Sequence, residues 1–159
     1  MSQRPTLDLE NFLPYRLTLL ASHVAVTFAK QHAQRFGISI PEWRVIATLG
    51  RNGSLTSGSL TERTGMDKAK VSRAVSRLQA AGLVERQVNE EDLRSAYLHL
   101  SDAGKAVHDK IVPIALELER DLVSSLSPEE LRTFKDVLVR LDKHVAEKYK
   151  NDLEGDPHI

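Results

Sequence analysis

The segment from Asp67 to Leu100 constrains the fold of this 159-residue chain more than any other part. It begins with a predicted helix over residues 67–81. One face of that helix is apolar at the spacing of helical turns, through Val71, Ala74, Val75 and Leu78. Two predicted strands follow, 84–88 and 95–100, joined by a polar linker, and the second alternates apolar and polar side chains as a half-buried strand does. The segment therefore predicts an amphipathic helix followed directly by a β-hairpin.

The opposite face of this predicted helix is suited to contact DNA. No acidic residue occurs from Lys68 to Ala81, and its alanine and serine side chains leave room for a close approach to base edges. An arginine fork matches the paired acceptors of guanine, and each good bidentate contact discriminates between bases by about 1–3 kcal/mol. The predicted contact residues are Lys68, Ala69, Lys70, Ser72, Arg73, Ser76 and Arg77.

The flanking segments complete a winged helix-turn-helix motif. Residues 56–64 form a short predicted helix, and Gly65 suits the tight turn that joins it to the next one. The hairpin adds Arg86, and its linker adds Asp92 and Arg94. A polar helical face with a few cations is common on solvated surfaces. Its combination with a preceding helix and an arginine-bearing hairpin predicts duplex DNA as the partner.

The charge balance argues against a protein that coats DNA without regard to sequence. The chain has 22 basic and 22 acidic residues, so its formal net charge is zero, whereas a coating protein is normally strongly basic. Its cations cluster locally around the predicted reading helix. This distribution is compatible with a specific DNA binder that concentrates positive charge on one face.

Several classes of site are absent from the sequence. It contains no cysteine, which excludes disulfides and thiolate zinc sites, and its histidines lack the spacing of a metal site. It has no phosphate-binding glycine loop and no nucleophile–base arrangement, so we expect neither an enzyme nor a bound cofactor or metal. No apolar run has the length of a membrane span and no signal-peptide pattern is present, so we expect a cytoplasmic protein without a membrane partner.

The sequence predicts a mainly α chain with a small two-stranded β wing. We expect four parts: an N-terminal arm and helix (1–36), a winged helix-turn-helix lobe (37–100), two C-terminal helices (101–150) and a flexible tail (151–159). Capping boxes with proline in the first turn, Ser39 to Glu42 and Ser127 to Glu130, predict two helix starts. Pro14 leaves open whether the first helix begins there or runs from Leu9 with a kink.

The long outer helices carry more apolar surface than the winged lobe can cover. In the first helix this surface comprises Leu13, Leu17, Leu20, Ala21, Val24 and Phe28. In the last two helices it comprises Leu116, Leu122, Val123, Leu126, Leu131, Phe134, Val137, Leu138, Leu141 and Val145. The simplest burial is a homodimer, whose two reading helices would lie roughly 34–36 Å apart in successive major grooves. The alternative is a monomer whose long helices pack on themselves.

The order of these elements and several strings resemble the MarR family of winged-helix transcriptional regulators over essentially the whole chain. The strings are Pro41-Glu-Trp-Arg-Val-Ile46, Met66-Asp-Lys-Ala-Lys-Val-Ser-Arg-Ala-Val-Ser-Arg-Leu78, Gly82-Leu-Val-Glu-Arg86, Asp92-Leu-Arg94 and Leu100-Ser-Asp-Ala-Gly104. The resemblance implies a dimer, usually a repressor, that binds a pseudo-palindromic operator. It also implies that the recognition helix enters the major groove and Arg94 the adjacent minor groove, with Asp92 holding the arginine or the wing backbone. Leu93 stands where family wings often have an arginine.

The resemblance also implies a small-molecule effector, because members of this family commonly respond to aromatic or phenolic anions bound between the dimerisation helices and the DNA-binding lobe. Arg16 and His23 lie seven residues apart at the edge of the first apolar stripe, and Trp43 and Arg44 open the second helix. A cation beside an aromatic ring and an apolar wall suits an aromatic carboxylate. Segments 12–16 and 40–44 are similar to the branch that controls aromatic-acid catabolism, which implies an aromatic acid or its coenzyme A thioester.

Three of these residues also suit purely structural roles, and the sequence leaves alternative functions open. Trp43 also suits the core, His23 a helix interface, and Arg16 a solvated or salt-bridged surface. The basic face of a winged helix can bind an acidic protein instead of DNA, which would make the chain a protein-interaction module. A regulator without a small-molecule effector is a further alternative. Repression, rather than activation, follows from the resemblance alone.

Overall fold

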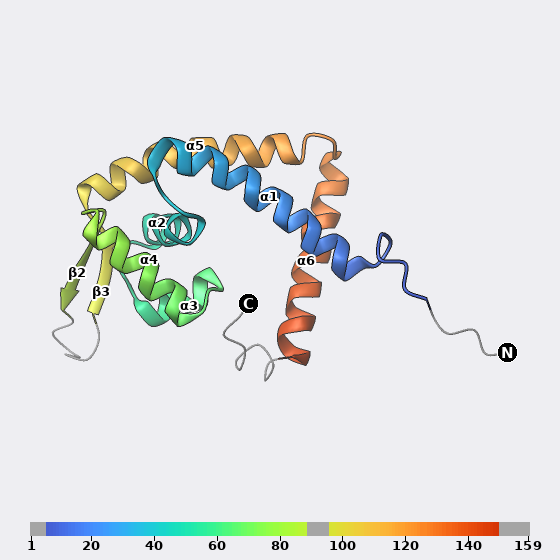
Figure 1. The fold of residues 1–159 in the computed structure, drawn as a ribbon, viewed down its shortest axis with the longest axis horizontal. Helices are drawn as coiled ribbons and strands as arrows, with labels where there is room; N and C mark the ends of the chain where they lie inside the picture. The colour runs from blue at the N-terminus through green and yellow to red at the C-terminus, as the bar shows by residue number, and fades with distance from the viewer. Residues whose placement is uncertain (1–5, 89–95, 150–159) are drawn as a thin grey trace.

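The computed structural model describes residues 6–88 and 96–149, apart from the side chains of residues 31–34, and this part is mainly helical (Figure 1). In chain order its elements are α1 (Leu13–Phe36), α2 (Ile40–Asn52), β1 (Leu55–Thr56), α3 (Ser57–Thr64), α4 (Lys68–Ala80), β2 (Val84–Val88), β3 (Ala96–Leu100), α5 (Asp102–Leu122) and α6 (Pro128–Lys148). The predicted fold class, a mainly α winged helix-turn-helix with long outer helices, is confirmed.

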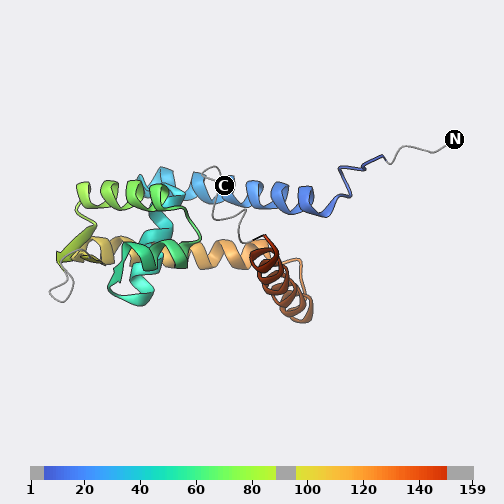
Figure 2. The same ribbon diagram turned by 90° about the horizontal axis from the view of Figure 1, so that it is seen from below.

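The elements form a lobe at one end of the molecule and an extended helical part at the other. Helices α2, α3 and α4 and the strands gather in the lobe, while α1 and α5 run from it toward the end where α6 lies (Figures 1 and 2). Helix α5 begins directly after β3, so the wing and the long helices are continuous in the chain. The winged lobe is therefore mounted on the outer helices rather than linked to them by a long loop.

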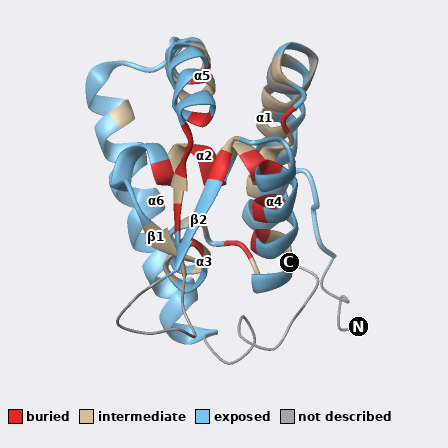
Figure 3. Cartoon of the chain, turned by 90° about the vertical axis from the view of Figure 1, so that its left-hand side faces the viewer, coloured by how far each residue is buried: buried red, intermediate tan, exposed pale blue. Residues whose placement is uncertain are grey.

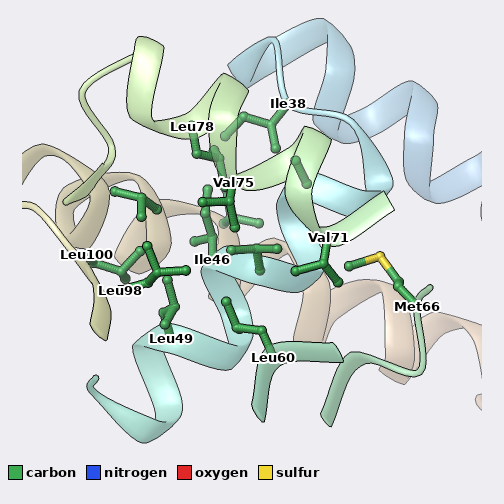
Figure 4. Packing of buried hydrophobic residues seen from close by; sticks show 14 residues of the cluster. Ile38, Ile46, Leu49, Leu60, Met66, Val71, Val75, Leu78, Leu98 and Leu100 are labelled. Atoms are coloured by element: carbon green, nitrogen blue, oxygen red, sulfur yellow. The ribbon is translucent and has the colours of Figure 1, made fainter. Parts of the chain in front are cut away.

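One hydrophobic core holds the lobe together (Figure 4). Ile46 and Leu49 of α2 are fully buried together with Leu60 of α3, and Ile111 of α5 is also part of the cluster. The predicted inner face of α4 faces this core, since Val71, Ala74, Val75 and Leu78 are all buried. Figure 3 shows that buried residues concentrate in the lobe, whereas α6 is exposed almost throughout.

The hairpin belongs to a three-stranded antiparallel sheet with the order β1-β3-β2. The two predicted strands pair with Val84 opposite Leu100 and Val88 opposite Ala96. The third strand was not predicted from the sequence. It pairs Leu55 with Leu98, and its two residues are too few for any alternation of apolar and polar side chains to be recognised.

Helix starts follow the capping signals in the sequence. Both predicted capping boxes are present, at the starts of α2 and α6, each with its serine and glutamate bonded reciprocally to the backbone. Helix α1 begins at Leu13, so Pro14 lies in its first turn, where the missing amide hydrogen costs no helical hydrogen bond. None of the helices in residues 6–88 and 96–149 combines the length and the apolarity that crossing a membrane requires.

Ser101 fixes the wing to the start of α5. Its hydroxyl donates to the carbonyl oxygen of Gly82 at 2.6 Å and accepts from the amide of Gly104 at 3.0 Å. Its own amide donates to the carbonyl oxygen of Leu83 at 3.1 Å. The turn between α4 and β2 is thereby held against the first turn of α5, and Gly104 lies so close to Leu83 that only a hydrogen fits between them.

We predict that Gly104→Ala lowers the free energy of unfolding by about 1–3 kcal/mol, because the new methyl group would overlap the backbone carbonyl of Leu83, which cannot rotate away. The matched control is Gly58→Ala, also in the first turn of a helix. Its new methyl group would meet only the Thr56 hydroxyl, at 3.8 Å, so we expect no loss or a gain of roughly 0.5–1 kcal/mol. Denaturant unfolding at one fixed protein concentration measures both, and equal losses would contradict this explanation.

Candidate nucleic-acid interface

The turn between α3 and α4 determines the direction of the predicted reading helix. Gly65 ends α3 with φ 64°, a left-handed conformation that glycine adopts without strain. Met66 is buried and anchors the turn in the core. Asp67 then caps α4, because its carboxylate accepts from the amide of Lys70 at 2.7 Å. These three residues make the compact connection that the sequence predicted.

The capping carboxylate remains charged at the N-terminus of α4. The hydrogen bond from the Lys70 backbone amide holds the pKa of Asp67 below its ordinary value, although partial desolvation acts in the opposite direction. The Lys70 ammonium group also lies 3.4 Å from this carboxylate. The first turn of α4 is thus capped from within the chain, so its outward cations rather than its free amides are the groups suited to bind an anionic partner.

The outer face of α4 is accessible along its length. Lys70 is half-buried, and the other predicted contact residues of the helix are exposed: Lys68, Ala69, Ser72, Arg73, Ser76 and Arg77. The Arg77 side chain is 72% exposed, and its Nη1 atom lies 3.7 Å from Oε1 of Glu42. Arg73 and Arg77 are thus both exposed and can reach a large partner.

The wing contributes a second exposed region at the same end of the molecule (Figure 1). Arg86 lies on β2 and is exposed, one residue from Glu85, whose carboxylate pairs with His99 across the hairpin at 3.2 Å. Asp92 and Arg94 lie outside the described residues. Of the predicted wing residues, the structure therefore places Arg86 alone.

A separate hollow of about 330 Å³ lies between α1 and α5. Its walls are mainly apolar and aromatic, and His23 contributes a polar group. Of the four residues predicted to bind an effector, His23 lines the hollow, whereas Arg16, Trp43 and Arg44 do not.

Trp43 does not line this hollow but contacts Phe28, which does. Its ring lies 5.9 Å from the ring of Phe28, which does line it, and Trp43 also packs against the lobe's core. Arg16 and Arg44 are exposed. The structure thus brings His23 and, through Phe28, Trp43 toward one hollow and leaves the two arginines apart from it.

Two features of these sites were not predicted from the sequence. Glu42 was identified only as part of a capping box, and its ion pair with Arg77 depends on the packing of α2 against α4. Glu119 and Asp121 add acidic groups to the hollow between α1 and α5, and Glu119 pairs with Lys135 at 3.0 Å. Within the described residues no group of histidine and acidic side chains could hold a metal ion.

Comparison with known proteins identifies relatives of one kind. A profile of the MarR family matches residues 36–95. The transcriptional regulator PecS of Dickeya dadantii is 27% identical over 148 residues, which cover 91% of this chain and 89% of PecS.

Solved structures share the fold across most of the chain. A mutant of E. coli MarR complexed with operator DNA superposes with a TM-score of 0.75 at 20% identity, covering 86% of this chain and 99% of that one. BpsR of Bordetella bronchiseptica, whose DNA binding is regulated by 6-hydroxynicotinic acid, gives a TM-score of 0.68 at 19% identity over 80% of this chain and 98% of its own.

These relatives are transcriptional regulators and not enzymes, in agreement with the prediction from the sequence. The profile match covers the segment in which α4 presents its exposed cations, and the similarity to PecS extends over nearly the whole chain. Residues 36–95 are a MarR-family segment, and the described part of the chain has the winged-helix fold of transcriptional regulators of that family.

Proposed function

We propose that this regulator binds a pseudo-palindromic operator as a homodimer, represses transcription there and is released by a small aromatic effector. The observation that carries the proposal is the outer face of α4, where Arg73 and Arg77 are exposed on a helix whose inner face is locked into the core. The operator complex of E. coli MarR, which has the same fold, supports duplex DNA as the partner of this face.

The recognition helix would act by insertion into the major groove. Ala69, Ser72 and Ser76 are small enough for the helix to approach base edges, and Arg73 projects directly away from the buried face. Arg86 on β2 would contact the sugar-phosphate backbone of the DNA, while Asp92 and Arg94 of the wing would act in the adjacent minor groove. In this arrangement α4 supplies most of the sequence selectivity.

We predict that Arg73→Ala weakens operator binding by about tenfold or more, because a bidentate arginine–guanine contact is worth about 1–3 kcal/mol. Arg51→Ala is the control, since Arg51 is exposed in the last turn of α2 and lines a hollow toward α5, away from the outer face of α4. Fluorescence anisotropy with the DNA upstream of its own gene measures both variants. Equal affinities for the Arg73→Ala variant and the unmodified chain would contradict the proposed reading face.

Unburied apolar surface on the long helices supports the homodimer. Helix α6 contains no buried residue, so within one chain it has no core to join. Large apolar side chains of α5, of α6 and of the turn between them are exposed, including Leu116, Leu122, Leu126, Phe134, Val137, Leu138, Leu141 and Val145. An apolar groove of about 910 Å³ runs between α1, the end of α5 and α6. A second copy of the same helices would cover these faces, and residues 1–36 and 101–150 are the proposed dimerisation parts.

We predict that Val137→Glu disrupts the dimer and weakens operator binding at least tenfold, because a carboxylate in a buried apolar interface has no partner. Val137 lines the groove and is 39% exposed. Val139→Glu is the matched control on the same helix, since Val139 does not line the groove and is 68% exposed. Light scattering gives the mass of each variant, and a Val137→Glu variant that stays dimeric would rule out this interface.

The hollow between α1 and α5 is the proposed effector site. Its apolar walls and the Phe28 ring suit an aromatic compound, and His23 can donate a hydrogen bond to a carboxylate or hydroxyl group. The negative charge of Glu119 is offset by Lys135. Regulation of BpsR by 6-hydroxynicotinic acid supports an aromatic acid as the effector class, and a coenzyme A thioester would have to extend out of the hollow.

We predict that an effector of this class raises the melting temperature, because it binds the folded protein and not the unfolded chain. It should also lower operator affinity, because it binds more tightly to the form that does not hold DNA than to the form that does. A thermal-shift screen of hydroxylated and unsubstituted aromatic acids and their thioesters identifies the compound. His23→Leu should then weaken its binding, whereas Arg44→Leu, outside the hollow, should not. A compound that stabilises the protein without changing operator affinity is not the inducer, and the absence of any active compound would favour a regulator without an effector.

A further inference from the structure

Glu42 is a buried carboxylate whose two oxygen atoms have different partners. It lies in the first turn of α2 and is 7% exposed. Its Oε2 atom accepts from the Ser39 amide at 2.8 Å, which closes the capping box. Its Oε1 atom lies 3.7 Å from Nη1 of Arg77 on the recognition helix. The carboxylate therefore connects the start of α2 with the DNA-binding face.

The second capping box of the chain shows that capping alone does not require this arrangement. Glu130 at the start of α6 also accepts from its box serine, Ser127, at 2.8 Å, but it is exposed. Within the described part of the chain, no lysine or arginine lies within 4.0 Å of its carboxylate. Burial and an arginine partner are thus features of Glu42 and not of the box.

Arg77 has a different environment from Arg73, one turn earlier on α4. At 100° per residue Arg73 projects away from the buried face, whereas Arg77 lies on the flank that borders α2. Among the ion pairs within 4.0 Å in the described residues, Arg77 pairs with Glu42, whereas Arg73 takes part in none and interacts only at longer range with the Asp67 carboxylate. Because the Arg77 side chain is 72% exposed, the contact with Glu42 leaves most of its donors accessible.

We propose that Glu42 is a positioning residue that makes Arg77 a determinant of operator selectivity. A carboxylate held by burial and by the Ser39 amide offers the guanidinium a fixed partner, so the fork is oriented before DNA arrives. The same negative charge offsets the attraction of Arg77 for phosphates, which is common to every DNA sequence. Arg77 then adds to DNA affinity chiefly at sequences whose bases place hydrogen-bond acceptors opposite its remaining donors. This inference rests on the proposed operator binding.

Glu42→Gln tests the charge while it preserves the cap, because the amide oxygen of glutamine can still accept from Ser39. We expect this variant to bind random duplex DNA more tightly and to lose about fivefold to tenfold in the ratio of operator to random-DNA affinity. The slope of log affinity against log salt should steepen, by up to about 0.9 for one additional phosphate contact. Glu130→Gln makes the same chemical change in the exposed box, at the edge of the proposed dimer groove, and should alter neither quantity when light scattering shows it to be a dimer.

A comparison of Arg73→Ala with Arg77→Ala leaves Glu42 unchanged and gives a second test. Arg73→Ala removes, in addition to its base contact, a cation with no acidic group of the described residues within 4.0 Å, and should reduce the salt slope by up to about 0.9, the value for one phosphate. Arg77→Ala should reduce the slope much less, because Glu42 already offsets its charge, and should still lower the affinity ratio. Adding Glu42→Gln to Arg77→Ala should then lower the ratio no further.

The outcomes separate this inference from the function on which it rests. An unmodified chain with equal affinity for operator and random DNA would overturn both. Where the unmodified chain is selective, two results would overturn the inference alone. The first is a folded Glu42→Gln variant that keeps the ratio of operator to random-DNA affinity and the salt slope. The second is an equal change of the salt slope in Arg77→Ala and Arg73→Ala. A purely structural role of Glu42 would lower the melting temperature without changing the salt slope, which would also overturn the inference.

Discussion

The packing of α4 against α2 and the rest of the core determines which side chains α4 leaves exposed. Val71, Ala74, Val75 and Leu78 occupy the inner side of α4, and burial of four such side chains fixes the rotation of the helix about its axis. A rotation of one residue, about 100°, would bring arginine into the core and valine to the surface. The cost of burying an unpaired cation excludes that arrangement, so the outer face is specified by the inner one.

Three hydrogen bonds of Ser101 join the wing to the long helices. Ser101 satisfies the carbonyl oxygen of Gly82 and the amide of Gly104 with one hydroxyl group, and its own amide satisfies Leu83. These bonds hold the end of the recognition helix, the start of β2 and the first turn of α5 in one unit. A movement of α5 would consequently be transmitted to the turn that follows α4 without an intervening flexible loop.

Sequence patterns predicted the features that depend on local chemistry. The caps at Ser39 and Ser127 follow from side chains that bond to amides three residues away, so spacing alone reveals them. Strand β1 has two residues and exists only because β3 offers it a partner, so no local pattern marks it. The contact between Glu42 and Arg77 joins residues 35 positions apart. It depends on how two helices pack, which a single sequence does not encode in a readable spacing.

The first turn of α2 is where the two proposed sites come closest in the chain. Trp43 packs against Phe28, which lines the hollow between α1 and α5, and the preceding residue, Glu42, contacts Arg77. Adjacent residues of a capped helical turn cannot move independently, because their backbones share its hydrogen bonds. A ligand that displaced Phe28 would therefore act on the turn that contacts Arg77. Coupling between the sites requires only that this turn differ between the bound and free forms, and not that the whole lobe rearrange.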